Sequence, residues 1–434
     1  MKRKRIIALA IALVMCLPSI AFANSQTMNG DNALVSTNPN ESVKVAISKK
    51  LQMPRGTPTP ETVFSFHAEG ISVDRDESAE IVNAMPKLDK NMTVQFLATH
   101  TGEPNADNIV TIIRETENIF DGVIFDEPGV YTYKITEVQA TSNGIENNRP
   151  YEQVTFSKAV YTMDIFVTWN SDRSATVISG VGTRVSVPDA GGVQEIDKKV
   201  DATPGGGSSG YNHSQMIFTN NYVKTNAPVD PDRPDPVNAS TLYISKTVTG
   251  NMGILSQYFD FEITLDVPEI LEEKPLSYKA YIVEGNTVID PTENAPGLTF
   301  TTPAGDIAIT ISTEGVNKFT LKDNQRLVFV DTPIGTKYTA TEDIAAGYLQ
   351  TVQVTTNAVA GGVISREGDN VLSTGPQFVG DKLNRAAFIN NRESAAPMGI
   401  DMNNLPFIGL ILLAIGALVM FVLVKSRRRR YETE

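Results

Sequence analysis

Cysteine and histidine are scarce in this chain of 434 residues, which contains one cysteine and three histidines. Cys16 lies in an N-terminal segment that we expect to be cleaved, so the mature chain has no disulfide, no cysteine nucleophile and no thioester. His67, His100 and His213 lack the spacing of metal ligands, which predicts no metal site. No Gly-rich phosphate loop or serine-nucleophile elbow occurs, and we expect no cofactor. These absences leave hydrolase and transferase chemistry without a supporting motif.

Positive charge is also in short supply, because 37 Lys and Arg residues stand against 50 Asp and Glu residues, a net charge of −13. An acidic balance of this size argues against nucleic acid as a partner. Residues 1–23 combine a basic start, an apolar run and the small-x-small site Ala21-Phe22-Ala23. This pattern is typical of a secretory signal peptide, and it predicts an extracellular protein that begins near Asn24.

An apolar run near the other end, residues 405–424, is long enough to cross a bilayer as a helix. The basic tail 425–434 follows it, which predicts that this end stays in the cytoplasm. The rest of the chain would then lie outside the cell, held at the membrane by its C-terminal span.

Between these ends, short β-branched and aromatic runs separated by turn residues predict an all-β protein. Residues 24–42 are polar and are expected to form a loose tail. The length suggests two domains, which we place at 43–225 and 240–392. The Pro/Asp-rich segment 226–239 separates them, and its alternate prolines favour an extended spacer.

The first strand of each predicted domain carries a lysine on its apolar face. Val43, Val45 and Ile47 alternate with period two, and the next residue in that register is Lys49. An unpaired ammonium group in a core is costly, so the amine either lies at a strand end or has a partner. Lys246 repeats the arrangement in the second domain.

A glutamate and an asparagine follow each lysine in the same kind of apolar register. In the first domain they are Glu137, after a tyrosine-rich strand, and Asn220, in the last strand. In the second domain they are Glu342 and Asn390. Taken singly, each could be a strand-end residue that faces water. The same ordered set of three in both domains favours a buried cluster with a shared purpose.

A buried lysine beside an asparagine, with a carboxyl group next to both, is a reactive set. Burial lowers the pKa of the lysine and gives a neutral amine nucleophile. Burial also raises the pKa of the glutamate, so that a neutral acid can hydrogen-bond and polarise the asparagine carbonyl. The amine attacks the amide carbon, ammonia leaves, and an amide bond joins the first strand to the last. Such groups act once on their own chain, so we do not expect an enzyme.

Several motifs resemble a known family. The first domain contains ISKKL, FSFHAEG, FDEPGVYTYKITE, VTWN and FTNNY, which look like the N-terminal domain of streptococcal-type backbone pilins. The second contains TLYISKTVTG, FDFEITL, FTLKDNQRLVFVDTPIGTKYTATED and FINN, which are similar to the second domain of such pilins. The resemblance covers residues 43–391 and implies two tandem Ig-like (CnaB-type) β-sandwich domains.

The family's isopeptide bonds carry over to the residues that the register selects. The resemblance implies a bond between Lys49 and Asn220 with Glu137 as catalytic acid/base. It implies a second bond between Lys246 and Asn390, with Glu342 in the same role.

The resemblance also implies a C-terminal sorting signal that a sortase cleaves, within residues 393–404. Such signals end in Pro-Thr-Gly, whereas this chain has Pro397, Met398 and Gly399. Methionine replaces the threonine whose carbonyl a sortase attacks, so a sortase of altered specificity would be needed. Leu405 to Gly409 is a rival match, but it adjoins the apolar span and would be hard to reach.

Polymerising pilins also use an exposed lysine of the first domain to accept the next subunit. Here His213 stands at the apparent position, and Lys198 and Lys199 are the nearest candidates, unless they are ordinary surface lysines. We expect a structural pilus shaft subunit of a Gram-positive cell surface, whose partners are a sortase and other pilin subunits or peptidoglycan. The alternative is a non-polymerising surface adhesin or stalk with a host-surface ligand. A membrane-tethered enzyme is a third possibility, and no motif supports it.

Overall fold

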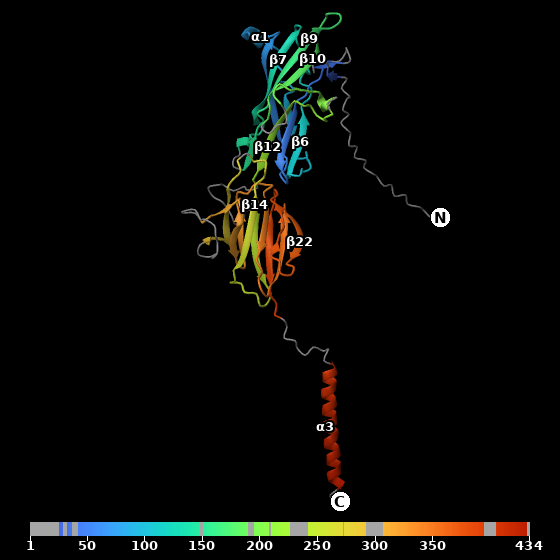
Figure 1. Ribbon diagram of the computed structural model, residues 1–434, viewed down its shortest axis with the longest axis vertical. Helices are drawn as coiled ribbons and strands as arrows, with labels where there is room; N and C mark the ends of the chain where they lie inside the picture. Colours follow the sequence, from blue (N-terminus) through green and yellow to red (C-terminus); the bar gives the residue numbers. More distant parts are fainter. Residues whose placement is uncertain are drawn as a thin grey trace, which may run out of the picture.

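The computed structural model describes residues 26–28, 33–36, 42–147, 151–189, 195–207, 210–225, 242–271, 273–291, 307–394 and 405–431. Strands dominate, as the sequence pattern predicts, and Figure 1 shows two β domains end to end along the long axis. The predicted signal peptide, residues 1–23, and the predicted spacer, residues 226–239, lie outside the described residues.

The described strands of the first domain form two sheets that enclose one apolar core. The larger sheet has the order β1-β2-β10-β9-β7-β4-β5 with β11 on β10, and the smaller has the order β6-β3-β12-β8. The strands are β1 (Gln26–Met28), β2 (Leu34–Ser36), β3 (Ser48–Pro54), β4 (Thr62–Val73), β5 (Thr93–Phe96), β6 (Ile109–Glu115), β7 (Gly129–Thr141), β8 (Glu152–Thr155), β9 (Val160–Trp169), β10 (Thr176–Val187), β11 (Lys199–Val200) and β12 (Ile217–Lys224), and one short helix, α1 (Ala79–Ala84), follows β4.

The described strands of the second domain also form two sheets around a core of their own. One has the order β16-β15-β19-β13-β25-β21-β22 with β17 on β15, and the other has the order β18-β14-β20-β23 with β24 on β20. The strands are β13 (Leu242–Thr249), β14 (Phe259–Asp266), β15 (Ser277–Glu284), β16 (Thr287–Ile289), β17 (Ile309–Ser312), β18 (Asn317–Leu321), β19 (Gln325–Phe329), β20 (Lys337–Glu342), β21 (Leu349–Thr356), β22 (Val359–Ser365), β23 (Leu372–Ser373), β24 (Gln377–Phe378) and β25 (Arg385–Asn391).

The expectation that residues 24–42 form a loose tail is wrong for β1 and β2, since β1 pairs with β2 and β2 pairs with β10 in the larger sheet. The lysine-bearing strand β3 begins later than the sequence pattern predicts, at Ser48 rather than at Val43. In the segment before it, Val43, Val45, Ala46 and Ile47 are nevertheless fully buried, whereas Lys44 is exposed. The backbone of this segment finds irregular partners instead of a ladder, since the N–H of Val45 bonds to the Asn118 side chain and that of Ile47 to the Thr116 hydroxyl. Backbone groups buried in this way must be paired, and side-chain acceptors take the place of a neighbouring strand.

The two domains contact each other directly at the end of β12. The Lys224 Nζ lies 2.7 Å from the Asp381 carboxylate, and the Lys224 carbonyl accepts the backbone N–H of Ile334 at 2.9 Å. Val223 packs with Ile270 in a small apolar cluster at the same place. The last strand of the first domain is therefore anchored in the second.

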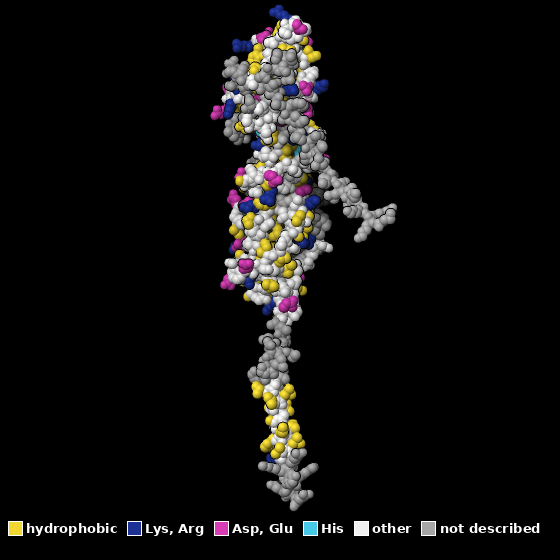
Figure 2. Space-filling view, turned by 90° about the vertical axis from the view of Figure 1, so that its right-hand side faces the viewer, with side chains coloured by type: hydrophobic (Ala, Val, Ile, Leu, Met, Phe, Trp, Pro, Cys, Tyr) yellow, Lys and Arg dark blue, Asp and Glu magenta, His cyan; other side chains and the backbone are white. Residues whose placement is uncertain are grey.

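The surface of the domains mixes both signs of charge. On the face in Figure 2, acidic and basic side chains are interspersed over both domains. The acidic excess of the chain therefore gives no continuous single-sign patch on this face.

A helix, α3 (Leu405–Tyr431), includes the predicted span 405–424. Among the helices within the described part of the chain, none combines the length and the apolar character needed to cross a membrane. The predicted transmembrane helix is therefore not confirmed.

Candidate functional site

The first cluster forms where β3 and β12 run side by side. The two strands are parallel, and their register pairs Lys49 with Phe218 and Leu51 with Asn220. Lys49 and Asn220 are therefore two residues apart along the ladder and share the inner face of the sheet. Both side chains are fully buried. In chain order, β3 is the first long strand of the domain and β12 is the last. Their pairing brings Lys49 and Asn220 together.

The carboxyl group of this cluster comes from the opposite sheet. Glu137 lies on β7, whose inner face continues Tyr131, Tyr133 and Ile135. Its Oε1 atom lies 2.6 Å from the Lys49 Nζ and accepts a hydrogen bond from the Asn220 Nδ2 at 2.8 Å. One carboxylate oxygen thus touches both the amine and the amide nitrogen.

Burial controls the electrostatics of this cluster. Desolvation lowers the pKa of Lys49 to about 8, although the nearby Glu137 carboxylate acts in the opposite direction. Desolvation also raises the pKa of Glu137, and Lys49 opposes that shift. The Lys49 Nζ lies 4.9 Å from the centre of the Phe64 ring, so the amine has an apolar wall on that side. The neutral amine that nucleophilic attack requires is accessible near pH 8.

A backbone donor completes the first cluster. The Ser157 N–H, in the loop after β8, donates to the Asn220 Oδ1 at 2.7 Å and to the Glu137 Oε2 at 3.1 Å. Because an N–H can only donate, it fixes which end of the Asn220 amide is the oxygen. The sequence-based expectation that the glutamic acid hydrogen-bonds the asparagine carbonyl is wrong for this geometry. The carboxyl group contacts the amide nitrogen, and Ser157 contacts the carbonyl.

The second cluster repeats the arrangement on different strands. β13 and β25 are parallel, and their register pairs Lys246 with Phe388 and Val248 with Asn390. Glu342 reaches in from β20 of the opposite sheet. Its Oε1 lies 2.5 Å from the Lys246 Nζ and accepts a hydrogen bond from the Asn390 Nδ2 at 2.7 Å.

Burial also sets the state of the second amine. Lys246 is 1% exposed, and desolvation lowers its pKa to about 8. The Nζ lies 4.2 Å from the centre of the Phe259 ring and 5.8 Å from that of Phe261. The two amines therefore have similar apolar surroundings and similar pKa values.

The clusters differ at the asparagine carbonyl. Among the described residues, no donor bonds to the Asn390 Oδ1 or to the Glu342 Oε2. The corresponding oxygens of the first cluster both accept the Ser157 N–H. The sequence gives no signal for this donor, because every residue except proline has a backbone N–H and Ser157 lies in a loop.

The other predicted residues lie elsewhere. Lys198 and Lys199 are exposed, and Lys199 begins β11 at the edge of the larger sheet of the first domain. His213 lies in the loop before β12, with its Nδ1 2.9 Å from the Ser214 carbonyl oxygen. The predicted sorting residues Pro397, Met398 and Gly399 fall outside the described residues. In the described ranges, no group of three or more His, Cys, Asp or Glu residues could hold a metal ion.

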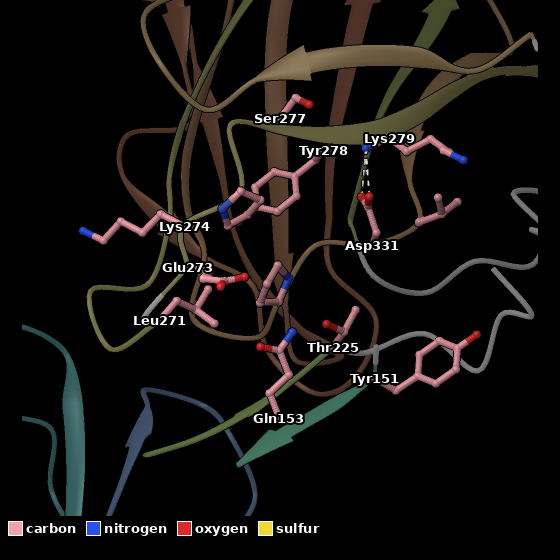
Figure 3. Close-up of a pocket in the computed structure, with 13 residues that line it drawn as sticks. Tyr151, Gln153, Thr225, Leu271, Glu273, Lys274, Ser277, Tyr278, Lys279 and Asp331 are labelled. Atoms are coloured by element: carbon pink, nitrogen blue, oxygen red, sulfur yellow. Dashed lines mark hydrogen bonds between the residues drawn. The ribbon is translucent and has the colours of Figure 1, made fainter. Parts of the chain in front are cut away.

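A cavity of about 500 Å³ lies at the junction between the domains. Figure 3 shows Tyr151 and Thr225 of the first domain on one side of it and Tyr278 and Asp331 of the second on the other. The Asp331 carboxylate accepts the Lys279 N–H at 2.9 and 3.1 Å, and desolvation raises its pKa to about 6. No residue of either Lys-Glu-Asn cluster lines this cavity, so it is a separate feature.

Comparison with known protein families bears directly on the first cluster. Residues 45–223 match the model of the Spy0128-like isopeptide containing domain. The first domain is therefore similar to this isopeptide-containing family. Residues 240–391 match the model of a domain of unknown function.

Known pilins are similar over most of the chain. A pilin of Streptococcus pyogenes serotype M1 is 24% identical over 387 residues, which cover 88% of this chain and 91% of the relative. The crystal structure of the major pilin from Streptococcus pyogenes covers 81% of this chain and 99% of its own at 20% identity, with a TM-score of 0.30. The major pilin T3.2 of the same species covers 81% and 99% at 16% identity, with a TM-score of 0.29. The resemblance to streptococcal-type pilins that the motifs indicate is confirmed.

Proposed function

We propose that this protein is a structural shaft subunit of a cell-surface pilus, built from two tandem Ig-like domains that each form one Lys–Asn isopeptide bond. The observation that supports this most strongly is the repeated burial of a lysine, a glutamate and an asparagine at the junction of the first and last strands. Pilin-like sequence over most of the chain supports this role, because a pilus shaft subunit would have to bear tension.

In each domain the neutral lysine amine attacks the amide carbon of the asparagine, forming a C–N bond. The glutamate oxygen, which contacts the lysine nitrogen and the amide nitrogen at once, takes a proton from the first and delivers it to the second. The original C–N bond breaks, ammonia leaves, and the carboxyl group is regenerated. Holding the reactants together contributes up to roughly 7–11 kcal/mol in well-oriented intramolecular reactions.

The position of each bond suits a load-bearing role. In the first domain it would join β3 to β12, and in the second β13 to β25, so each crosslink connects the two ends of its domain. A pull along the chain would pass through the crosslink, and the strands between would carry no load. By analogy with a disulfide, closing a loop of this size lowers the entropy of the denatured state and raises its free energy by roughly 5 kcal/mol.

Polymerisation would require two further sites. A sortase would act in the segment 393–404, with Pro397, Met398 and Gly399 as its signal, after a signal peptide has directed export. Lys198 and Lys199 are exposed on the first domain and are the candidate acceptors for the next subunit. Attachment would place the protein on the cell surface or in the cell wall.

The loop before β12 favours a second candidate, a non-polymerising surface adhesin or stalk. In this loop His213, not lysine, stands where the resemblance places the acceptor. The same two domains would then present a binding face without forming a fibre.

Immunoblots of native cell-surface extracts separate the two. A shaft subunit gives a ladder of SDS-resistant high-mass species that disappears when the sortase gene is deleted. Replacing both Lys198 and Lys199 with arginine should collapse that ladder, whereas replacing the exposed Lys158 with arginine should leave it intact. A single band from the unaltered protein contradicts the shaft and supports the adhesin.

A further inference from the structure

One aspartate ties a loop to the last strand of the first domain. Asp189 follows β10, and its Oδ1 accepts the Ser157 hydroxyl at 2.5 Å and the backbone N–H groups of Lys158 and Ala159 at 3.0 and 3.1 Å. Its Oδ2 accepts the backbone N–H of Thr219 at 2.9 Å. The carboxylate therefore bonds the 157–159 loop and β12 at the same time.

The hydrogen bonds of Asp189 lie directly beside the reacting Asn220 amide. Thr219 precedes Asn220 on β12, so Asp189 brings the loop to the point where Asn220 enters the core. On the other side of the loop, the Gln139 side chain donates to the Ser157 carbonyl at 3.1 Å. Ser157 is 3% exposed, and with its neighbours held on both sides its N–H is directed at the Asn220 Oδ1.

We propose that the Ser157 backbone N–H is the oxyanion donor for isopeptide formation in the first domain, and that Asp189 is the positioning residue that holds it there. This proposal deepens the proposed function and rests on it.

The donor would act at the step in which charge develops. When the Lys49 Nζ bonds to the amide carbon of Asn220, the carbonyl electron pair moves to the Oδ1 atom. The Ser157 N–H already contacts that atom, and its hydrogen bond strengthens as the oxygen becomes negative. Glu137 then moves the amine proton to the Nδ2 atom, the carbonyl re-forms, and ammonia departs. Removing one such donor in enzymes lowers the rate about 10²–10³-fold.

The second domain supplies an internal reference. Within the described part of that domain, the Asn390 Oδ1 has no hydrogen-bond donor, although its lysine and glutamate match those of the first. The first-domain bond should therefore form faster than the second in the same molecule, by at least tenfold.

The test follows both bonds over time in the full-length chain. A short isotope pulse during cell-free synthesis labels new chains, which are quenched in acid at intervals and digested. Mass spectrometry then measures the crosslinked Lys49–Asn220 and Lys246–Asn390 peptides. Asp189→Asn should slow the first bond about 10–100-fold and leave the second unchanged.

Asp323→Asn is the matched control. Asp323 accepts the Val248 N–H at 2.7 Å and, like Asp189 in the first domain, raises the pKa of the nearby buried lysine. Among the described residues, it holds no donor at the Asn390 carbonyl. If the two aspartates acted through charge alone, removing either would favour the neutral amine and speed its bond. Positioning predicts the opposite sign for Asp189→Asn.

Folding is separated from chemistry in a Glu137→Ala background, where no first-domain bond is expected. There Asp189→Asn should shift the unfolding temperature by only a few degrees. If Asp189→Asn instead prevents folding of the first domain, Ser157→Ala is the deciding variant. It keeps the backbone N–H and removes the hydrogen bond from the Ser157 hydroxyl to Asp189. It should slow formation of the first isopeptide bond two- to tenfold. An unchanged rate in the folded Asp189→Asn or in Ser157→Ala overturns this proposal alone. Absence of both crosslinked peptides from the unaltered protein overturns the proposed function instead.

Discussion

In the first domain, the Asn220 amide lies between a carboxylate and a backbone N–H, whereas among the described residues the Asn390 amide of the second domain meets the carboxylate alone. The surrounding sheets differ as well. The first lysine and asparagine lie in the four-stranded sheet, and the second pair lies in an eight-stranded sheet. What the domains share is a parallel pair of strands with a glutamate facing it from the other sheet. The parallel pair and the facing acid are therefore the common requirement, and the carbonyl donor is an addition.

Removing one glutamate at a time should produce the largest difference in stability between the two domains. Glu137→Ala should abolish the bond of the first domain only, and Glu342→Ala that of the second only, because each acid serves its own cluster. Each loss should lower the unfolding temperature of the affected domain by about 10–20 °C. Differential scanning calorimetry would measure this.

Exposed glutamates provide the controls for these two variants. Glu69→Ala and Glu262→Ala each remove a surface ion pair, with Lys134 and Lys318 respectively. Such pairs contribute about 1 kcal/mol or less, so neither variant should move a transition by more than a few degrees. If loss of Glu137 destabilises both domains equally, the clusters are not independent.

The rates of formation of the two bonds should depend on pH in the same way, because the two amines have similar pKa values. Burial lowers the pKa of both Lys49 and Lys246 to about 8. Below that pH the protonated amine cannot attack, so both rates should fall about tenfold for each pH unit and level off above about 8. The pulse-labelled peptide measurement, repeated from pH 6 to 9, gives both profiles from one sample. A rate that rises as the pH falls would show that the neutral amine is not the nucleophile.

The smallest effect is expected at the junction between the domains. Lys224→Gln removes the ion pair with Asp381. The two side chains are 32% and 28% exposed, so the loss should lower the free energy of unfolding by about 1 kcal/mol or less. Both crosslinks should still form, since Lys224 belongs to neither cluster. Calorimetry should show a shift of a few degrees at most, and a lost crosslink would mean that the junction helps to shape a cluster.

The sequence predicts the side chains of the clusters but not the backbone N–H that contacts the first of them. A polar residue in an apolar register is visible in a strand pattern, which is why Lys49, Glu137 and Asn220 could be selected. Ser157 acts through its N–H, a group that leaves no mark in the residue type. Asp189 lies in a loop after β10, where an aspartate is ordinary, and only the fold shows what it holds.

The expected role of the acid was wrong for a related reason. Register places the glutamate beside the asparagine, but it does not say which end of the amide faces the acid. In the folded first domain, the Ser157 N–H takes the oxygen and leaves the nitrogen to Glu137. The orientation depends on a partner from a third segment of the chain, and strand periodicity carries no information about it.

The mass of the intact, purified chain tests the central claim most directly. Two isopeptide bonds predict a mass lower than that of the sequence by two ammonias, with Glu137→Ala and Glu342→Ala each restoring one. A folded protein that has the full mass of its sequence would contradict the account, because both lysines would then still be free amines.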